Sequence, residues 1–134
     1  PVYIGRGYRD MNMKTDYSIE IRDRHLYVDG AGLFSNDDLK RMLEQLAAVQ
    51  ADTDIEAVLI DMQKAEKANG TIELYQRALA IADTTKGLNL RIALVVKNNL
   101  LEDHRFFETV ARNRGCFLAV FSEADTALGW LGNT

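Results

Sequence analysis

"AVLIDMQKAEKANGTIELYQRALAIADTTKG", residues 57–87, joins two hydrophobic patterns of different period. Residues 57–62 form a short, continuous apolar run, which is typical of a strand covered on both faces of a sheet. Residues 71–87 carry a helical pattern that ends at Lys86 and Gly87, a usual end signal for a helix. The stretch therefore predicts a buried strand followed by a helix.

The same order recurs twice towards the C-terminus. "RIALVV" (91–96) predicts a buried strand, and "LLEDHRFFETVARNRG" (100–115) predicts the helix after it. "CFLAVF" (116–121) predicts a third such strand, and a final apolar helix follows it. Alternation of strands and helices is typical of a largely parallel sheet with helices packed against it.

The residues before this region follow a different pattern. Apolar residues alternate with polar ones from Tyr17 to Ile21 and again in "HLYVDG" (25–30), which predicts a half-buried hairpin. A helix over 35–50 follows, with Ser35 as its N-cap. We predict a single-domain α/β fold over residues 15–134, with an N-terminal hairpin, largely parallel later strands and about four helices. Residues 1–14 are expected to be a leader or an edge segment.

Composition excludes several classes of partner. The 134 residues carry 16 Lys and Arg against 20 Asp and Glu, so the net charge of −4 does not favour nucleic acid. No apolar run reaches the roughly 20 residues of a transmembrane segment. One cysteine, Cys116, excludes an internal disulfide framework and fits a reducing compartment, so we expect a cytoplasmic protein.

No combination of residues predicts catalysis, a metal site or a cofactor. His104 and Glu108 have helical i, i+4 spacing, but two ligands do not make a metal site. Cys116 opens a predicted buried strand, where a thiol is usually inert. Gly30 and Gly32 lack the further glycine and lysine of a phosphate-binding loop, and we interpret them as a strand end that needs backbone freedom.

Several stretches resemble the STAS domain, the fold of bacterial anti-sigma-factor antagonists, and more closely its SpoIIAA-like branch. The most specific are "RFFETVARNRG" (105–115), "FLAVF" (117–121) and "ADTALGWL" (124–131), which resemble that branch's closing helix and its Trp-Leu ending. "YVDGAGLFSNDDLKRML" (27–43) resembles the family's second strand running through a glycine into the first helix. The resemblance extends from Tyr17 to Leu131.

The resemblance implies a switch region. In regulatory members a strand ends in aspartate, and a loop leads to an Asp-Ser-x-Gly stretch whose serine a partner kinase phosphorylates. Asp61 matches the strand-end aspartate, Asn69 stands at the second aspartate, and Gly70 replaces the serine. Thr71 is the nearest hydroxyl. These four residues are the candidate switch and partner surface.

Thr71 has two interpretations. A phosphate at a helix N-terminus would meet unpaired N–H groups and the positive end of the helix dipole. An unmodified threonine there can serve as the N-cap, a contribution of about 1 kcal/mol, and this is the simpler expectation. Asn69 is the competing cap.

We therefore predict a non-catalytic protein-interaction module whose partner is a kinase-like or sigma-pathway regulator. Self-association as a homodimer is compatible with so small a domain, and the sequence leaves the oligomeric state open. The alternative is a domain that binds a small apolar or lipid-like ligand, since SpoIIAA-like proteins resemble Sec14-type lipid-transfer domains in fold. Four aromatic residues could wall such a pocket: Phe106, Phe107, Phe117 and Phe121.

Overall fold

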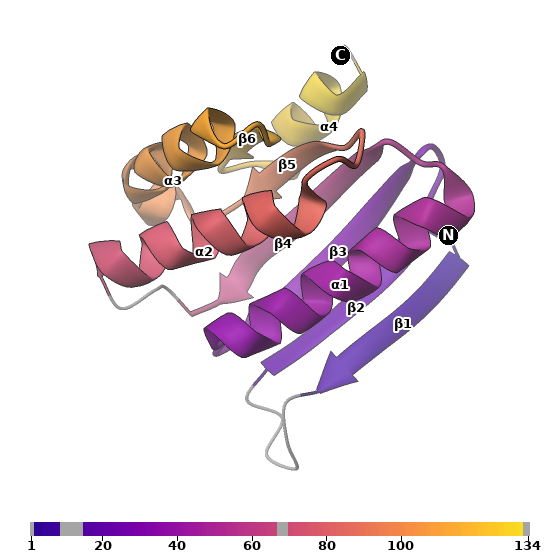
Figure 1. Cartoon of the computed structure of the whole chain (residues 1–134), viewed down its shortest axis with the longest axis horizontal. Coiled ribbons are helices and arrows are strands. Elements are labelled where there is room, and N and C mark those ends of the chain that lie inside the picture. Colours follow the sequence, from indigo (N-terminus) through magenta and orange to yellow (C-terminus); the bar gives the residue numbers. More distant parts are fainter. Residues whose placement is uncertain (1, 9–14, 67–69, 133–134) are drawn as a thin grey trace.

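A six-stranded mixed sheet forms the centre of the molecule (Figure 1). The computed structural model describes residues 2–8, 15–66 and 70–132. The strands are β1 (Val2–Tyr8), β2 (Thr15–Arg22), β3 (His25–Gly32), β4 (Ala57–Ala65), β5 (Arg91–Val95) and β6 (Phe117–Phe121). They lie in chain order across the sheet. Strands β1 to β3 pair antiparallel, and β3 to β6 pair parallel.

Helices cover both faces of the sheet. They are α1 (Asn36–Thr53), α2 (Thr71–Thr85), α3 (Leu101–Asn113) and α4 (Ala124–Gly132), with a 3-10 turn, η1 (Asn98–Leu100), before α3. The predicted α/β class, with an N-terminal hairpin, parallel later strands and four helices, is confirmed. Among the residues that the structure describes, no helix is both long and apolar enough to cross a membrane.

The direction of the crossovers decides which face each helix covers. The connections through α1, α2 and α3 each lead to the next parallel strand in the same direction across the sheet. Because such crossovers are right-handed, all three helices lie on one face (Figure 1). α4 follows the last strand and packs on the other face, against β4, β5 and β6.

β4 extends beyond its predicted end, and β1 lies in the segment expected to be a leader or an edge segment. β4 continues three residues beyond Met62, because Lys64 and Ala65 pair with the end of β3 after an irregularity in the register. β1 pairs with β2 at the sheet edge, with a register shift between Tyr3 and Gly5. The sequence of β1 lacks the alternation of apolar and polar residues that identifies β2 and β3, so only its backbone pairing with β2 shows that it is a strand.

The two glycines of β3 have different roles. A Cβ at Gly30 would lie 2.5 Å from Sδ of Met62 and 3.2 Å from Cζ of Phe34, so a larger residue would have to displace the Met62 side chain. Gly32 ends the strand with φ at 86°, in the left-handed region that favours glycine. The chain then turns towards α1 with Phe34 buried under the helices.

Side chains of α3 bind the outer edge of β6. Nε of Arg112 donates to the carbonyl oxygen of Leu118 at 2.7 Å. The backbone N–H of Val120 donates to the Glu108 carboxylate, also at 2.7 Å. β6 is the last strand of the sheet, so these groups have no neighbouring strand to bind. The helix supplies the partners that a seventh strand would otherwise provide.

Candidate functional site

α2 begins at a glycine turn and not at a side-chain cap. Gly70 is the N-cap residue with φ at 95°, and it has no side chain with which to cap the helix. A φ of this size is open to glycine and strained for most other residues. Thr71 is therefore the first helical residue, and the prediction that it caps α2 is wrong. The competing cap, Asn69, lies outside the described residues.

Thr71 is nevertheless exposed at the start of α2. The N–H groups of a first helical turn point away from the helix, and the N-cap residue here, Gly70, has no side chain to accept from them. The acidic residue of the same turn, Glu73, is paired with Arg77 at 2.8 Å.

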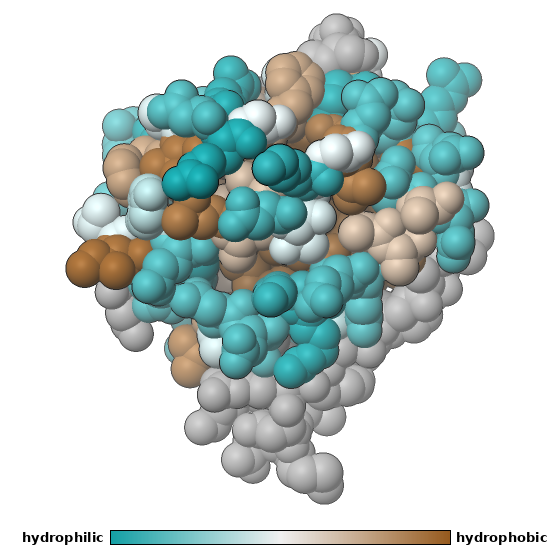
Figure 2. All heavy atoms as spheres, viewed as in Figure 1, coloured by the Kyte–Doolittle hydropathy of each residue, from teal (hydrophilic) through white to brown (hydrophobic). Residues whose placement is uncertain are grey.

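Three exposed apolar side chains lie beside this helix start. Ile72 is 76% exposed, Tyr75 is 38% exposed, and Phe106 of α3 is 43% exposed. The rings of Tyr75 and Phe106 lie 6.4 Å apart, and Ile72 shares a helix face with Tyr75 at i, i+3. We call these three residues the α2–α3 patch. Figure 2 shows apolar surface at the N-terminal end of α2 among largely hydrophilic surroundings.

Asp61 lies on the opposite face of the sheet from α2. Its carboxylate accepts hydrogen bonds from the Tyr27 hydroxyl at 3.0 Å and from the backbone N–H of Gln63 at 3.1 Å. Tyr27 packs against the residues under α4. Asp61 is thus part of β4, the strand that leads to α2. Its side chain, however, lies on the face of the sheet that α4 covers and not at the start of α2.

The contact with Asp61 also changes the acidity of Tyr27. Burial, and then the Asp61 carboxylate, raise the pKa of the Tyr27 phenol to about 12. The guanidinium carbon of Arg22 lies 3.6 Å from the centre of the same ring, a cation–π geometry. Tyr27 therefore stays protonated near neutral pH and serves as a hydrogen-bond donor.

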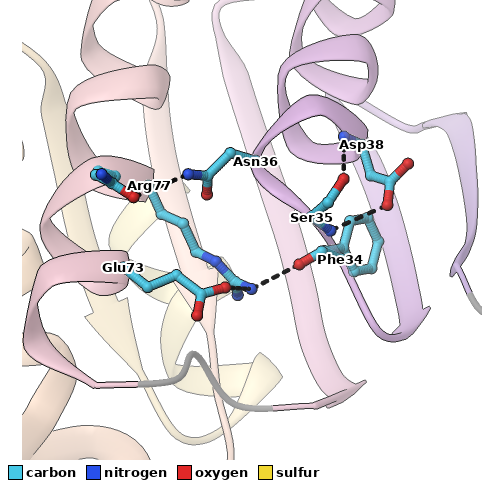
Figure 3. A network of polar contacts seen from close by, with 7 residues as sticks. Phe34, Ser35, Asn36, Asp38, Glu73 and Arg77 are labelled. Atoms are coloured by element: carbon cyan, nitrogen blue, oxygen red, sulfur yellow. Dashed lines mark hydrogen bonds and ion pairs between the residues drawn. The ribbon is translucent and has the colours of Figure 1, made fainter.

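The predicted N-cap of α1 at Ser35 is confirmed, and a second, reciprocal hydrogen bond accompanies it. The Ser35 hydroxyl accepts from the backbone N–H of Asp38, and the Asp38 carboxylate accepts from the backbone N–H of Ser35, both at 3.0 Å. This is a capping box, which satisfies two backbone donors at the helix start (Figure 3). The box fixes the start of α1 beside α2.

An arginine that the sequence analysis did not single out links α1 and α2. Nη2 of Arg77 donates to the Phe34 carbonyl oxygen at 2.7 Å and to the Glu73 carboxylate at 2.8 Å (Figure 3). Asn36 adds a bond to Gln76 at 3.0 Å. The i, i+4 spacing of Glu73 and Arg77 is a signal for the ion pair. Nothing in the spacing indicates that Arg77 is buried.

The structure does not bring the four predicted pocket residues together. Phe117 and Phe121 contact Trp130 on the α4 side of the sheet, with ring centres 5.3 and 5.7 Å away. Phe106 and Phe107 belong to α3, on the other side. Phe106 is part of the exposed patch, and Phe107 is buried in the core.

Phe107 lines a different space, a cavity of about 50 Å³ between the sheet and the first three helices. The strands and helices around it contribute mostly aliphatic side chains, with three polar exceptions: Glu66, Arg77 and His104. Its apolar lining includes Met42, Ile60, Met62, Ala65, Ile81, Leu94 and Phe107. A volume of this size is too small for a lipid chain.

The remaining chemically notable residues have structural partners. His104 Nδ1 lies 3.0 Å from the Leu100 carbonyl oxygen, and burial lowers the pKa of His104. Glu108 is bonded to the edge of β6. The Cys116 thiol is buried 3.8 Å from the Thr85 hydroxyl, and burial raises its pKa. Across the described ranges, no three His, Cys, Asp or Glu side chains gather as a metal site would require.

Comparison with known proteins finds a match in structure and none in sequence. No protein-family model and no curated protein matches the chain. A crystal structure of an anti-sigma factor antagonist from Mycobacterium paratuberculosis superposes with a TM-score of 0.63 at 18% identity. The match covers 88% of this chain and 94% of that one. The chain therefore has the fold of an anti-sigma factor antagonist, as its resemblance to the STAS domain predicts.

Proposed function

We propose that this chain is a non-catalytic regulatory module that binds a protein partner through the α2–α3 patch and the adjoining start of α2. The observation that carries the proposal is the exposure of Ile72, Tyr75 and Phe106 beside one helix start. Exposed apolar residues gathered in one place mark interaction sites more often than scattered ones do.

The fold supports the class of partner. The superposed mycobacterial protein is described as an antagonist of an anti-sigma factor, which is a protein-binding role. By analogy of fold, the partner of this chain is a kinase-like or sigma-pathway regulator. Aromatic residues such as Tyr75 and Phe106 are enriched at the centres of such interfaces.

A switch at Thr71 is the finer part of the proposal. The hydroxyl is exposed at the first helical position, and Glu73 is already paired with Arg77. A phosphate there would lie at the positive end of the helix dipole, which stabilises negative charge. It would also place charge next to Ile72, and burying that charge in an apolar interface would weaken partner binding.

The binding surface is tested by affinity capture with Ile72→Glu as bait. The matched control is Leu128→Glu, because Leu128 is also an exposed apolar helix residue, 38% exposed, but lies on α4. A regulator captured by wild type and Leu128→Glu and lost by Ile72→Glu supports the proposal. Equal capture by all three baits overturns it.

The switch has its own matched pair. Thr71→Glu and Thr126→Glu each add one charge to an exposed threonine in a first helical turn, on α2 and α4 respectively. We expect only Thr71→Glu to lose the partner, while Thr71→Ala keeps it. If Thr71→Glu binds as wild type does, the interaction surface stands and the switch is discarded.

A further inference from the structure

A larger hollow lies on the α4 face, at the end of the sheet where β3, β4 and β5 begin. Its volume is about 460 Å³, which is within the range of sites that bind small molecules. The walls come from the β2–β3 turn, the first residues of β3, β4 and β5, and the last turns of α4. We call it the α4 pocket, and its lining consists of Asp23, Arg24, His25, Ala57, Arg91, Leu128, Leu131 and Gly132.

The guanidinium of Arg91 reaches the wall of this pocket. Arg91 opens β5 between Ala57 of β4 and Phe117 of β6, and both of these neighbours pack on the α4 side of the sheet. Nη2 of Arg91 donates to the carbonyl oxygen of Leu131, another lining residue, at 3.4 Å. Nε is enclosed by the protein, so it cannot meet a ligand. Nη1, by contrast, is accessible and bonds to no residue that the structure describes.

The charges around the α4 pocket leave one positive charge unbalanced. Arg24 and Arg91 bring two positive charges and Asp23 one negative charge. Within the described part of the chain, no carboxylate forms an ion pair with either arginine. His25 adds no charge near pH 7, because burial and then the nearby Arg22 lower its pKa. Charges that are partly removed from water are normally paired, so the pocket favours one negative charge on a ligand.

The rest of the lining favours an apolar ligand body. Ala57, Leu128 and Leu131 are the apolar wall residues, and Leu128 is 38% exposed. An apolar wall with a few polar groups that fix orientation is the usual form of a small-molecule site. A guanidinium pairs strongly with carboxylate oxygens. A carboxylate carries the one negative charge that the pocket lacks, whereas a phosphate dianion would exceed it.

We propose that the α4 pocket binds a small molecule with one carboxylate and a compact apolar body. The carboxylate accepts a hydrogen bond from Nη1 of Arg91, and the charge of Arg24 attracts it. The apolar body packs against Leu128 and Leu131. This site lies on the opposite face of the sheet from the α2–α3 patch, at the other end of β4 from the start of α2. It is therefore independent of the proposed partner surface, and either proposal can fail without the other.

The test titrates three compounds with one apolar body into the full chain: 4-phenylbutyrate, 4-phenylbutyramide and 4-phenylbutylamine. Backbone amide shifts are followed by NMR. 4-Phenylbutyrate should bind with a dissociation constant on the order of 1 mM, which is reasonable for about twelve heavy atoms. Its largest shifts should fall on the β2–β3 turn, the starts of β4 and β5, and the end of α4. The amide and the amine should bind at least tenfold more weakly.

Two variants locate the carboxylate, and the ratio of 4-phenylbutyrate affinity to 4-phenylbutyramide affinity is the readout. Arg91→Met removes the guanidinium but keeps a long side chain, and the ratio should fall about tenfold. Its control is Arg114→Met, at an exposed arginine outside the pocket. Leu128→Glu adds a negative charge to the exposed wall and should lower the ratio about fivefold, even if Arg91→Met does not fold. Thr126→Glu adds the same charge to α4 outside the pocket and should leave the ratio unchanged.

Three results would overturn the proposal. Equal affinities of the wild-type chain for the carboxylate and the amide would show that the pocket does not recognise an anion. A ratio that Leu128→Glu changes no more than Thr126→Glu does would place the carboxylate elsewhere. An absence of shifts at the lining residues with all three compounds at about 20 mM would show that the hollow is not a ligand site.

Discussion

The two faces of the sheet are built in different ways. On one face, α1, α2 and α3 bury large aliphatic side chains from β2 to β6 in one continuous cluster. On the other, α4 packs against β4, β5 and β6, and half of the six buried residues in that smaller cluster are alanines. The larger cluster contains most of the buried apolar residues and the cavity, so it is expected to supply most of the stability. The α4 face is a thin layer added to a sheet that is already supported.

Matched leucine truncations would sharpen that contrast most. Leu46 of α1 is fully buried in the larger cluster, and Leu131 of α4 is 4% exposed in the smaller one. We expect Leu46→Ala to lower the free energy of unfolding by about 3–4 kcal/mol and Leu131→Ala by about 2 kcal/mol. The loss expected for Leu131→Ala is smaller because the end of a short terminal helix can shift to fill the space.

Urea unfolding followed by circular dichroism measures both variants. Leu128→Ala, at an exposed site on α4, serves as the control and should change stability by less than about 0.5 kcal/mol. A Leu131→Ala cost equal to or above that of Leu46→Ala would contradict the view of α4 as a thin added layer.

A second prediction compares two helix starts within the larger face. Ser35 is part of a capping box at α1, whereas Thr71 follows a glycine turn at α2 and caps nothing. Ser35→Ala should cost about 1 kcal/mol, and Thr71→Ala should cost less than about 0.5 kcal/mol. Thermal unfolding of the two variants is sufficient. Equal losses of stability in the two variants would show that Thr71 does cap α2.

The last prediction concerns the α4 face and pH. The pKa of Tyr27 is raised to about 12 from the ordinary 10.0. The unfolded chain therefore releases this proton first as the pH rises, and the stability it contributes is present below pH 10 and lost towards pH 12. Tyr27→Phe should lose less stability than wild type between about pH 9 and pH 11.

Urea unfolding at those two pH values tests this, with Tyr75→Phe as the control at an exposed tyrosine of α2. The control should follow wild type. A Tyr27→Phe variant with the same pH dependence as wild type would show that the bond to Asp61 does not hold the phenol proton.

The contrast between the faces also explains what could be predicted from the sequence. β4 to β6 are covered on both sides and are continuous apolar runs, while β2 and β3 are covered on one side and alternate. The hairpin, the parallel strands and the Ser35 cap follow from those patterns. β1 does not, because it has no such period and is recognised only through its pairing with β2.

The candidate site was harder to predict from the sequence than the fold was, because the site depends on the direction in which each side chain points. Thr71 has the right residue type for a cap, but the backbone turns one residue earlier, at Gly70. Phe106 and Phe107 are adjacent on a helix, so they point about 100° apart and only one can enter the core. In the sequence, the spacing of Arg77 and Glu73 indicates an ion pair on the surface of a helix. The burial of Arg77 follows only from the packing of α1 against α2.

The bonds from α3 to β6 bear on how copies of this chain can meet. A free strand edge is a template on which a strand of another molecule can add, and repeated addition produces polymers. At β6 an incoming strand would have to displace Arg112 from Leu118 and Glu108 from Val120, two bonds of 2.7 Å. Growth of the sheet past β6 is therefore opposed by the helix beside it. An assembly of copies through strand addition would have to use the β1 edge.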